Sequence, residues 1–127
     1  MNQRSITRES QMKLGSLLGF DVLGSQDWEL ECADLNRIGE FLDLYEDQGL
    51  NDDERFALMA LIVASFDDYL STNRNDVALA SRIRRHLTTH FELHKSTIHY
   101  WSLPGESKPE TLFSITPFIR QIVGQGA

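Results

Sequence analysis

The stretch DDERFALMALIVASFDDYLST, residues 52–72, decides the fold of this chain. Its longer apolar side chains recur at spacings of three and four and form one face: Phe56, Met59, Ile62, Val63, Phe66 and Leu70. The other side is apolar too, because it carries Ala57, Leu61 and Ala64. A helix that is apolar nearly all round is buried in the middle of a protein. The sequence therefore predicts a central helix against which the other segments pack.

Residues 34–48, which precede the central helix, predict an amphipathic surface helix. Apolar side chains fall on one stripe: Leu35, Ile38, Phe41, Leu42 and Tyr45. Polar side chains fall on the opposite side: Asn36, Glu40, Asp43 and Asp47. This division is typical of a helix with one face on the core and the other in water.

The junction of these two helices, residues 43–54, invites comparison with a calcium-binding EF-hand loop. Four ligand positions of such a loop are filled, by Asp43, Asp47, Asn51 and Glu54. However, Tyr45 stands at another ligand position, and Gly49 comes one residue too late for the sharp turn. A helix corner explains the residues better, with Gly49 in a left-handed ending and with Asn51 and Glu54 forming a capping box. We therefore predict a helix–turn–helix corner without calcium.

Residues 76–101 continue the helical pattern. Apolar residues and one histidine recur at spacings of three and four: Ala80, Ile83, Leu87, Phe91, His94, Ile98 and Trp101. A single helix of this length would extend about 39 Å, which is long for a small domain. The sequence therefore predicts a kink or break near Thr88 and Thr89.

The same segment carries His86, His90 and His94, each four residues from the next. Two histidines one turn apart can chelate a metal, and HFELH approaches the zinc protease motif. In that motif the glutamate follows the first histidine directly, whereas Glu92 comes one place later. Three histidines spread over two turns cannot meet at one ion, so only a pair could bind, with Asp67 or Asp68 from another helix. We predict structural histidines, with His94 in the core or an interface.

The two ends of the chain are less periodic. MKLGSLLGFDVLGS predicts a short helix or irregular packing, and the alternation in WELEC predicts one short strand within residues 28–32. The tail is expected to start extended and then form a helix, with Thr116 as N-cap and Pro117 at the first helical position. The fold class predicted is all-α, an irregular or orthogonal bundle of four to five helices. Residues 1–127 are expected to form a single domain, in which residues 1–12 could fray.

Composition limits the setting of the protein. With 127 residues and 41% hydrophobic content, the chain can bury one core without disulfides or metals. Cys32 is the single cysteine, so no disulfide can form within the chain, which fits a reducing compartment. No apolar run has the length of a signal peptide or a membrane span. We expect a cytoplasmic protein without a membrane partner.

The net charge of −7 is unevenly distributed. Residues 21–68 hold fourteen acidic residues against Arg37 and Arg55, and residues 74–95 reverse this balance. The acidic excess argues against nucleic acid as the main partner. Two roles remain open for Arg82, Arg84 and Arg85: pairing within the protein, for example with Asp68, or docking an acidic partner.

The acidic surface at the helix corner is the candidate binding site. It comprises Glu40, Asp43, Asp47, Asp52 and Asp53. Complementary charge accelerates encounter and selects partners, so a protein partner with a basic surface is expected. Bacterial immunity proteins and antitoxins, which block basic nucleases, are one class with such properties, as an analogy of type. The predicted function is a non-enzymatic protein-binding module.

Catalytic residues and cofactors are not expected. The glycines do not form a phosphate loop, the serines lack a nucleophile-elbow pattern, and acidic neighbours make Cys32 a poor nucleophile. Two alternatives stay open. One is a structural or regulatory subunit that forms a homodimer through apolar helix surface. The other is a metal-binding protein or enzyme that uses the helix with His86, His90 and His94.

Overall fold

The computed structural model describes residues 4–21, 24–47 and 49–126, and over these ranges the fold is all-α, as predicted. The helices are α1 (Arg8–Leu18), α2 (Trp28–Glu31), α3 (Ile38–Tyr45), α4 (Asp52–Ser71), α5 (Val77–Thr89), α6 (Lys95–Ser102) and α7 (Thr116–Gly126), with a 3-10 turn, η1, at Pro109–Thr111. None of the described helices is long and apolar enough to span a membrane.

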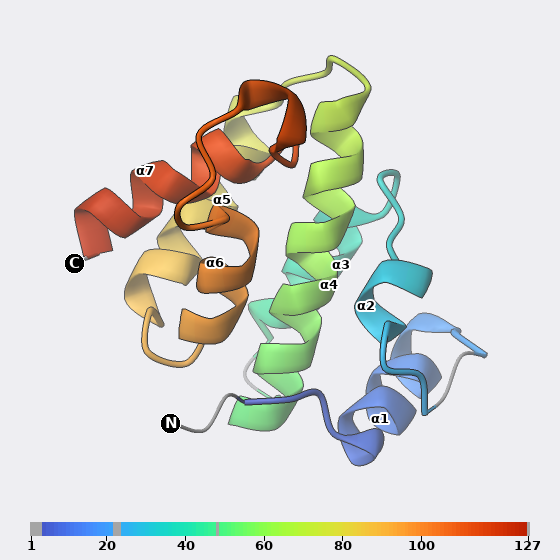
Figure 1. Cartoon of the computed structure of the whole chain (residues 1–127). Helices are drawn as coiled ribbons and strands as arrows, with labels where there is room; N and C mark the ends of the chain where they lie inside the picture. The colour runs from blue at the N-terminus through green and yellow to red at the C-terminus, as the bar shows by residue number, and fades with distance from the viewer. Residues whose placement is uncertain (1–3, 22–23, 48, 127) are drawn as a thin grey trace.

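Helix α4 is the centre of the fold, as its sequence predicted (Figure 1). Every residue from Phe56 to Phe66 is buried. Helices α1, α2 and α3 pack directly on α4, while α6 and α7 pack on each other and α5 joins α7 to α3. Side chains connect the two groups, because the ring of Phe66 lies edge-on to Phe118 of α7 at a centroid distance of 5.5 Å.

The corner between α3 and α4 is held by the predicted capping box. The Asn51 side chain accepts from the Glu54 amide at 2.8 Å, and the Glu54 carboxylate accepts from the Asn51 amide at 2.9 Å. The left-handed ending predicted for Gly49 is wrong, because Gly49 does not adopt positive φ. Instead α3 ends earlier, at Tyr45, and the Gly49 amide donates to the Asp47 side chain at 2.9 Å. A side-chain turn therefore replaces the glycine ending.

The predicted break in the segment 76–101 is confirmed. Helix α5 ends at Thr89, His90 follows as its C-cap with φ −113°, and α6 starts after His94. The two helices therefore fold back on the core separately instead of forming one long rod.

The strand predicted within residues 28–32 is wrong, because Trp28–Glu31 forms one turn of helix, α2. Trp28 and Cys32 are buried, whereas Leu30 between them is 47% exposed. A strand would place all three on one face, whereas a helix places residues four apart together. The segment is therefore helical, because Trp28 and Cys32 both face the core and Leu30 does not.

The two ends of the chain follow the sequence in outline. Arg8 to Met12 belong to α1, whose N-cap Thr7 accepts from the Ser10 amide at 3.0 Å; residues 1–3 lie outside the described structure. The tail contains η1 before α7, which begins at Thr116 with Pro117 in its first turn. The Thr116 hydroxyl donates to the Trp101 carbonyl at 2.8 Å and fixes α7 to the end of α6.

Candidate functional site

The five carboxylates predicted to bind a partner are all exposed near the α3–α4 corner. They are Glu40, Asp43, Asp47, Asp52 and Asp53. Three of them, Glu40, Asp43 and Asp53, already have a cationic partner within the protein. Asp43 binds Arg82 of α5 at 2.9 Å, and Asp53 binds Arg4 at 2.6 Å. The corner is therefore less repulsive than its acidic sequence suggested.

Glu40 is the most firmly paired of these carboxylates. Both of its oxygens accept from the Arg37 guanidinium at 2.8 Å, which lowers the pKa of the Glu40 carboxyl. Arg37 also donates to the Leu18 carbonyl and lies 5.3 Å from the ring centroids of Phe20 and Phe41. Glu40 thus helps to orient an arginine that joins α3 to the end of α1.

The remaining acidic side chains carry the free charge of the corner. Asp47 and Asp52 have no ion pair among the described residues. Asp43 keeps 77% of its side chain exposed in spite of its bond to Arg82. These three residues stand at the end of α3, in the turn and at the start of α4, so the accessible negative charge is concentrated at the corner itself.

The arginines of α5 pair within the protein, but with α3 and α7. Arg82 binds Asp43 and Glu46, each at 2.9 Å, and Arg85 binds Glu46 at 3.3 Å. Arg84 donates to Gln121 at 3.3 Å and lies 5.0 Å from the Phe118 ring centroid. Asp68, the partner suggested by the sequence, is exposed and forms no ion pair with any described residue.

The three histidines surround Tyr45, whose hydroxyl connects α3 to the α5–α6 turn. Its oxygen lies 2.7 Å from Nε2 of His94 and 3.2 Å from Nδ1 of His90. The ring of His86 packs on the Tyr45 ring at a centroid distance of 4.8 Å. Beside it, Nε2 of His86 lies 2.8 Å from the Glu46 carboxylate. We call these five residues the Tyr45 cluster.

The direction of the hydrogen bonds in the Tyr45 cluster follows from burial. His94 is fully buried, and burial, aided by the nearby charges of His90, His86 and Arg4, lowers its pKa to about 3, so it is neutral at pH 7. Its Nδ1 meets no polar atom among the described residues. An unmet buried N–H costs more than an unmet lone pair, so we place the proton of His94 on Nε2, which donates to Tyr45. The Tyr45 hydroxyl then donates to His90.

This arrangement assigns the histidines to packing between helices. Burial raises the pKa of Tyr45 to about 12, so its hydroxyl keeps its proton over the whole neutral range. His94 occupies the core position that the sequence predicted. Asp67, proposed above as an additional metal ligand, accepts instead from the Ile115 amide at 2.9 Å. In the described part of the chain, no three His, Cys, Asp or Glu side chains are placed to hold an ion together.

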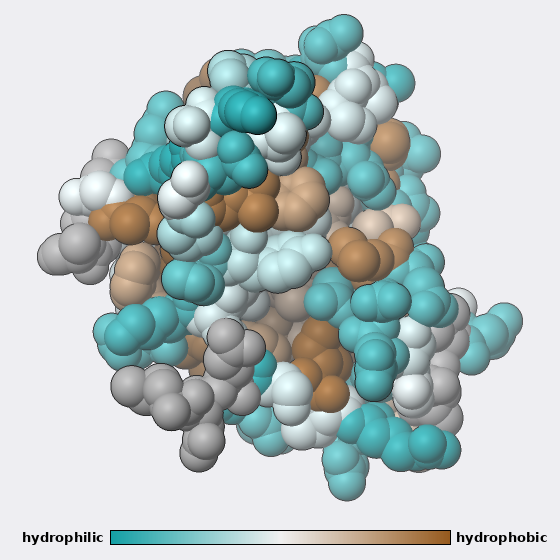
Figure 2. Space-filling view, in the orientation of Figure 1, coloured by the Kyte–Doolittle hydropathy of each residue, from teal (hydrophilic) through white to brown (hydrophobic). Residues whose placement is uncertain are grey.

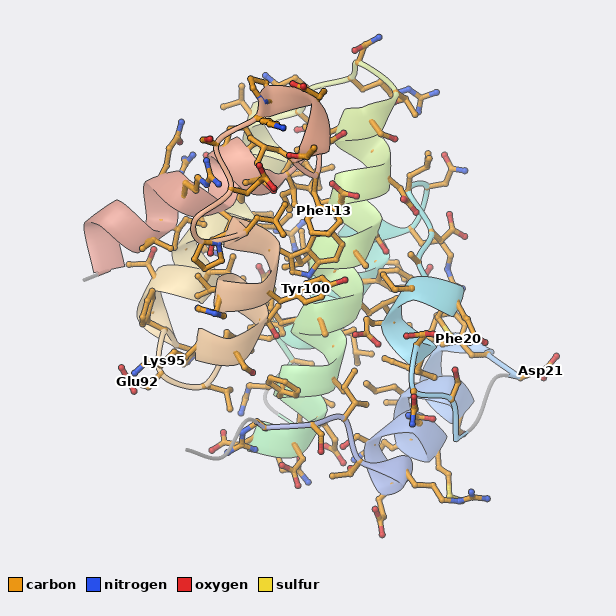
Figure 3. The ribbon with its side chains drawn as sticks, viewed as in Figure 1. Phe20, Asp21, Glu92, Lys95, Tyr100 and Phe113 are labelled. Atoms are coloured by element: carbon orange, nitrogen blue, oxygen red, sulfur yellow. The ribbon has the colours of Figure 1, made fainter. Side chains whose placement is uncertain are left out.

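A cavity of about 630 Å³ is a feature that the sequence did not reveal. Its floor is α4, at Phe56 and Ala60, and its walls come from residues 4–8, the loop leading into α2, and α6. It opens on the face shown in Figure 2, where apolar and pale side chains lie between hydrophilic rims. Figure 3 shows Tyr100, one of its wall residues, in front of α4 and next to Phe113, on which it stacks at 5.7 Å.

Comparison with known proteins adds no information on function, because no protein-family model, curated protein or solved structure matches this chain. Function is therefore inferred from the geometry and charge of the described residues alone.

Proposed function

We propose that this protein is a non-enzymatic binding module whose acidic corner docks a protein with a basic surface. The observation that carries this proposal is the accessible charge of Asp43, Asp47 and Asp52, which lie together where α3 meets α4. Charge of one sign gathered on a small area raises association rates with a surface of opposite sign.

The rigidity of the corner supports the same function. The capping box fixes the start of α4, and Leu50 is buried beneath the turn. The Gly49 amide fixes the Asp47 side chain, and the Arg82 guanidinium fixes that of Asp43. Carboxylates that are already held in place lose less conformational entropy when a partner binds.

The internal ion pairs still leave room for a partner. Pairs at the surface contribute about 0–1 kcal/mol each, so a cationic side chain of a partner can share or replace Arg82 at low cost. Glu40 is different, since both of its oxygens are occupied by Arg37. We therefore assign the main contribution to Asp43, Asp47 and Asp52 and a smaller one to Glu40 and Asp53.

The test uses two triple variants with the same change in net charge. The corner variant carries Asp43→Asn, Asp47→Asn and Asp52→Asn, where asparagine keeps the shape and the turn-forming oxygen of aspartate. The control variant carries Asp21→Asn, Asp68→Asn and Glu110→Gln, which are exposed acidic residues outside the corner. Each protein, including the wild type, is immobilised and exposed to extract of the native cell at low salt, and captured proteins are quantified.

We expect a basic protein that the wild type and the control variant capture and that the corner variant does not. Its association rate, measured with the purified pair, should fall about tenfold in the corner variant at low salt and approach the wild-type rate at high salt. If every captured protein binds the corner and control variants equally, the corner is only solvated surface and the proposal is wrong.

A further inference from the structure

The cavity between α2, α6 and residues 4–8 carries charges of both signs that do not pair with each other. Arg8 lines it and has no hydrogen bond or ion pair with any described residue. Arg4 also lines it, but its charge is balanced by Asp53 at 2.6 Å. Within the described ranges, Arg8 is therefore the lining cation whose guanidinium has no partner.

The acidic lining residues, Asp27 and Glu29, also lack an ion pair within the described ranges. They stand two residues apart at the start of α2, and burial first, with the charge of Asp27 in addition, raises the pKa of Glu29. Oε1 of Glu29 is buried without a hydrogen-bond partner among these residues. A cation beside the two carboxylates would stabilise both.

The apolar lining of the cavity is accessible at two side chains. Phe56, Ala60 and Trp101 line it, but they are buried, with only 4%, 5% and 5% exposed. Leu30 and Tyr100, which also line it, are 47% and 54% exposed and belong to the few large apolar side chains left in water among the described residues. Exposed apolar surface gathered in a hollow of about 630 Å³ has the size and character of a small-molecule site.

One part of the cavity rim is held in place by hydrogen bonds. The Gln11 side chain accepts from the Gly24 amide at 2.6 Å and donates to the Ser25 carbonyl at 3.2 Å, which fixes the loop that precedes α2. Gly24 has φ +77°, and a Cβ at this position would lie 3.4 Å from Nη1 of Arg8. The glycine therefore permits the turn, and the Arg8 guanidinium lies within van der Waals distance of it.

We propose that this cavity binds a small zwitterion with a large apolar side chain, such as an aromatic amino acid or a dipeptide. The carboxylate of the ligand binds Arg8, its ammonium group lies beside Asp27 and Glu29, and its side chain packs on Leu30 and Tyr100. The cavity offers one guanidinium and two carboxylates without an ion pair among the described residues, together with exposed apolar side chains, which is what such a ligand requires. None of the corner carboxylates lines this cavity, and the proposal does not depend on the function proposed for the corner.

The test uses the dipeptide leucyl-phenylalanine and two blocked forms. The N-acetyl form lacks the ammonium group, and the C-terminal amide lacks the carboxylate. Free phenylalanine shows whether one residue is enough, and glycyl-glycine lacks the apolar side chains. Binding is followed by amide chemical shifts, with attention to residues 24–30 and 96–101, and affinities are measured by calorimetry.

Arg8→Gln and Asp27→Asn separate the two ends of the ligand, and Arg74→Gln is the matched control because Arg74 is an exposed arginine between α4 and α5. Asp27 makes no side-chain cap bond to α2, so its substitution should not unfold the helix. We expect each blocked form to bind about tenfold more weakly, as the loss of one charged hydrogen bond predicts. Arg8→Gln should lower the affinity for the free dipeptide about tenfold and leave the affinity for the C-terminal amide unchanged. Asp27→Asn should likewise lower the affinity for the free dipeptide and leave the affinity for the N-acetyl form unchanged.

Two results would overturn the proposal. One is the absence of saturable shifts around the cavity with millimolar leucyl-phenylalanine and phenylalanine. The other is binding in which blocked and free forms do not differ, or in which Arg8→Gln and Arg74→Gln have equal effects. Because each variant is compared with its own blocked ligand, a general loss of stability cannot imitate the expected pattern.

Discussion

Asn51 is the residue that holds the α3–α4 corner together. Its side chain and its backbone amide both bond to Glu54, so one residue satisfies two groups at the start of α4. We predict that Asn51→Ala lowers the free energy of unfolding by about 1 kcal/mol, the usual cost of a lost N-cap. Urea unfolding measures it. Asn51→Ser, which keeps a capping oxygen, should stay close to the wild type, and equal losses in both variants would contradict the role of the cap.

The residues of this corner show what a sequence can predict at the smallest scale. Asn51 and Glu54 were predicted correctly because a capping box depends only on residues three apart. Gly49 was not, because two local endings compete there. The Asp47 side chain binds the Gly49 amide and closes the turn without a left-handed residue.

The corner also bears on calcium, since its acidic residues first suggested an ion site. Asp43 is bonded to Arg82, and Tyr45 is buried with its hydroxyl directed to the histidines. We predict that millimolar calcium added to chelator-treated protein leaves the amide chemical shifts of residues 43–54 without a saturable change. A saturable shift there would show that the corner binds the ion.

At the scale of elements, the Tyr45 hydroxyl is the polar connection between α3 and the α5–α6 turn. We predict that Tyr45→Phe lowers the free energy of unfolding by about 1–3 kcal/mol, because buried His94 then keeps no hydrogen bond on either ring nitrogen. Thermal or urea unfolding checks the value. Tyr69→Phe is the matched control, since the Tyr69 hydroxyl has no hydrogen bond to the described residues and its ring stacks on Phe66.

The type of an element could be predicted where its apolar residues fitted only the helical repeat, and not where they fitted both the helical and the strand repeat. The apolar pattern of residues 52–72 allowed only a helix, and α4 follows it almost to the residue. The short segment WELEC fitted both periods, and its helical form depends on Trp28 and Cys32 facing the same core, which requires knowledge of the partner helices. The break after Thr89 was predictable because no small core accommodates a rod of that length.

At the scale of the whole molecule, the candidate site was only partly accessible to sequence reasoning. The acidic residues of the corner could be listed, but their pairing with Arg4 and Arg82 joins distant parts of the chain and follows from the packing alone. The cavity is assembled from four separate segments, and none of its residues forms a recognisable motif. Its lining becomes visible only once α2 and α6 are placed on either side of α4.

Stability at alkaline pH follows from two buried groups. Burial raises the pKa of Tyr45 from 10.0 to about 12 and that of Cys32 from 9.0 to about 11. Between these values the unfolded chain has lost protons that the folded protein keeps. The contribution of both groups to stability is therefore complete below pH 9 and is lost as the pH rises through 11 and 12.

Stability at acidic pH depends first on His94, whose pKa falls from 6.5 to about 3 on folding. Between these values the unfolded chain binds a proton that the folded protein does not, so stability rises with pH through this window and falls as the pH is lowered. We predict a loss of about 2 kcal/mol from pH 7 to pH 5 in urea unfolding. Glu46, whose pKa falls from 4.5 to about 2, adds a further loss below pH 4.5. His94→Gln should flatten the dependence between pH 7 and pH 5 whatever its effect on stability at pH 7, and an unchanged slope in that variant would show that His94 is not the titrating group.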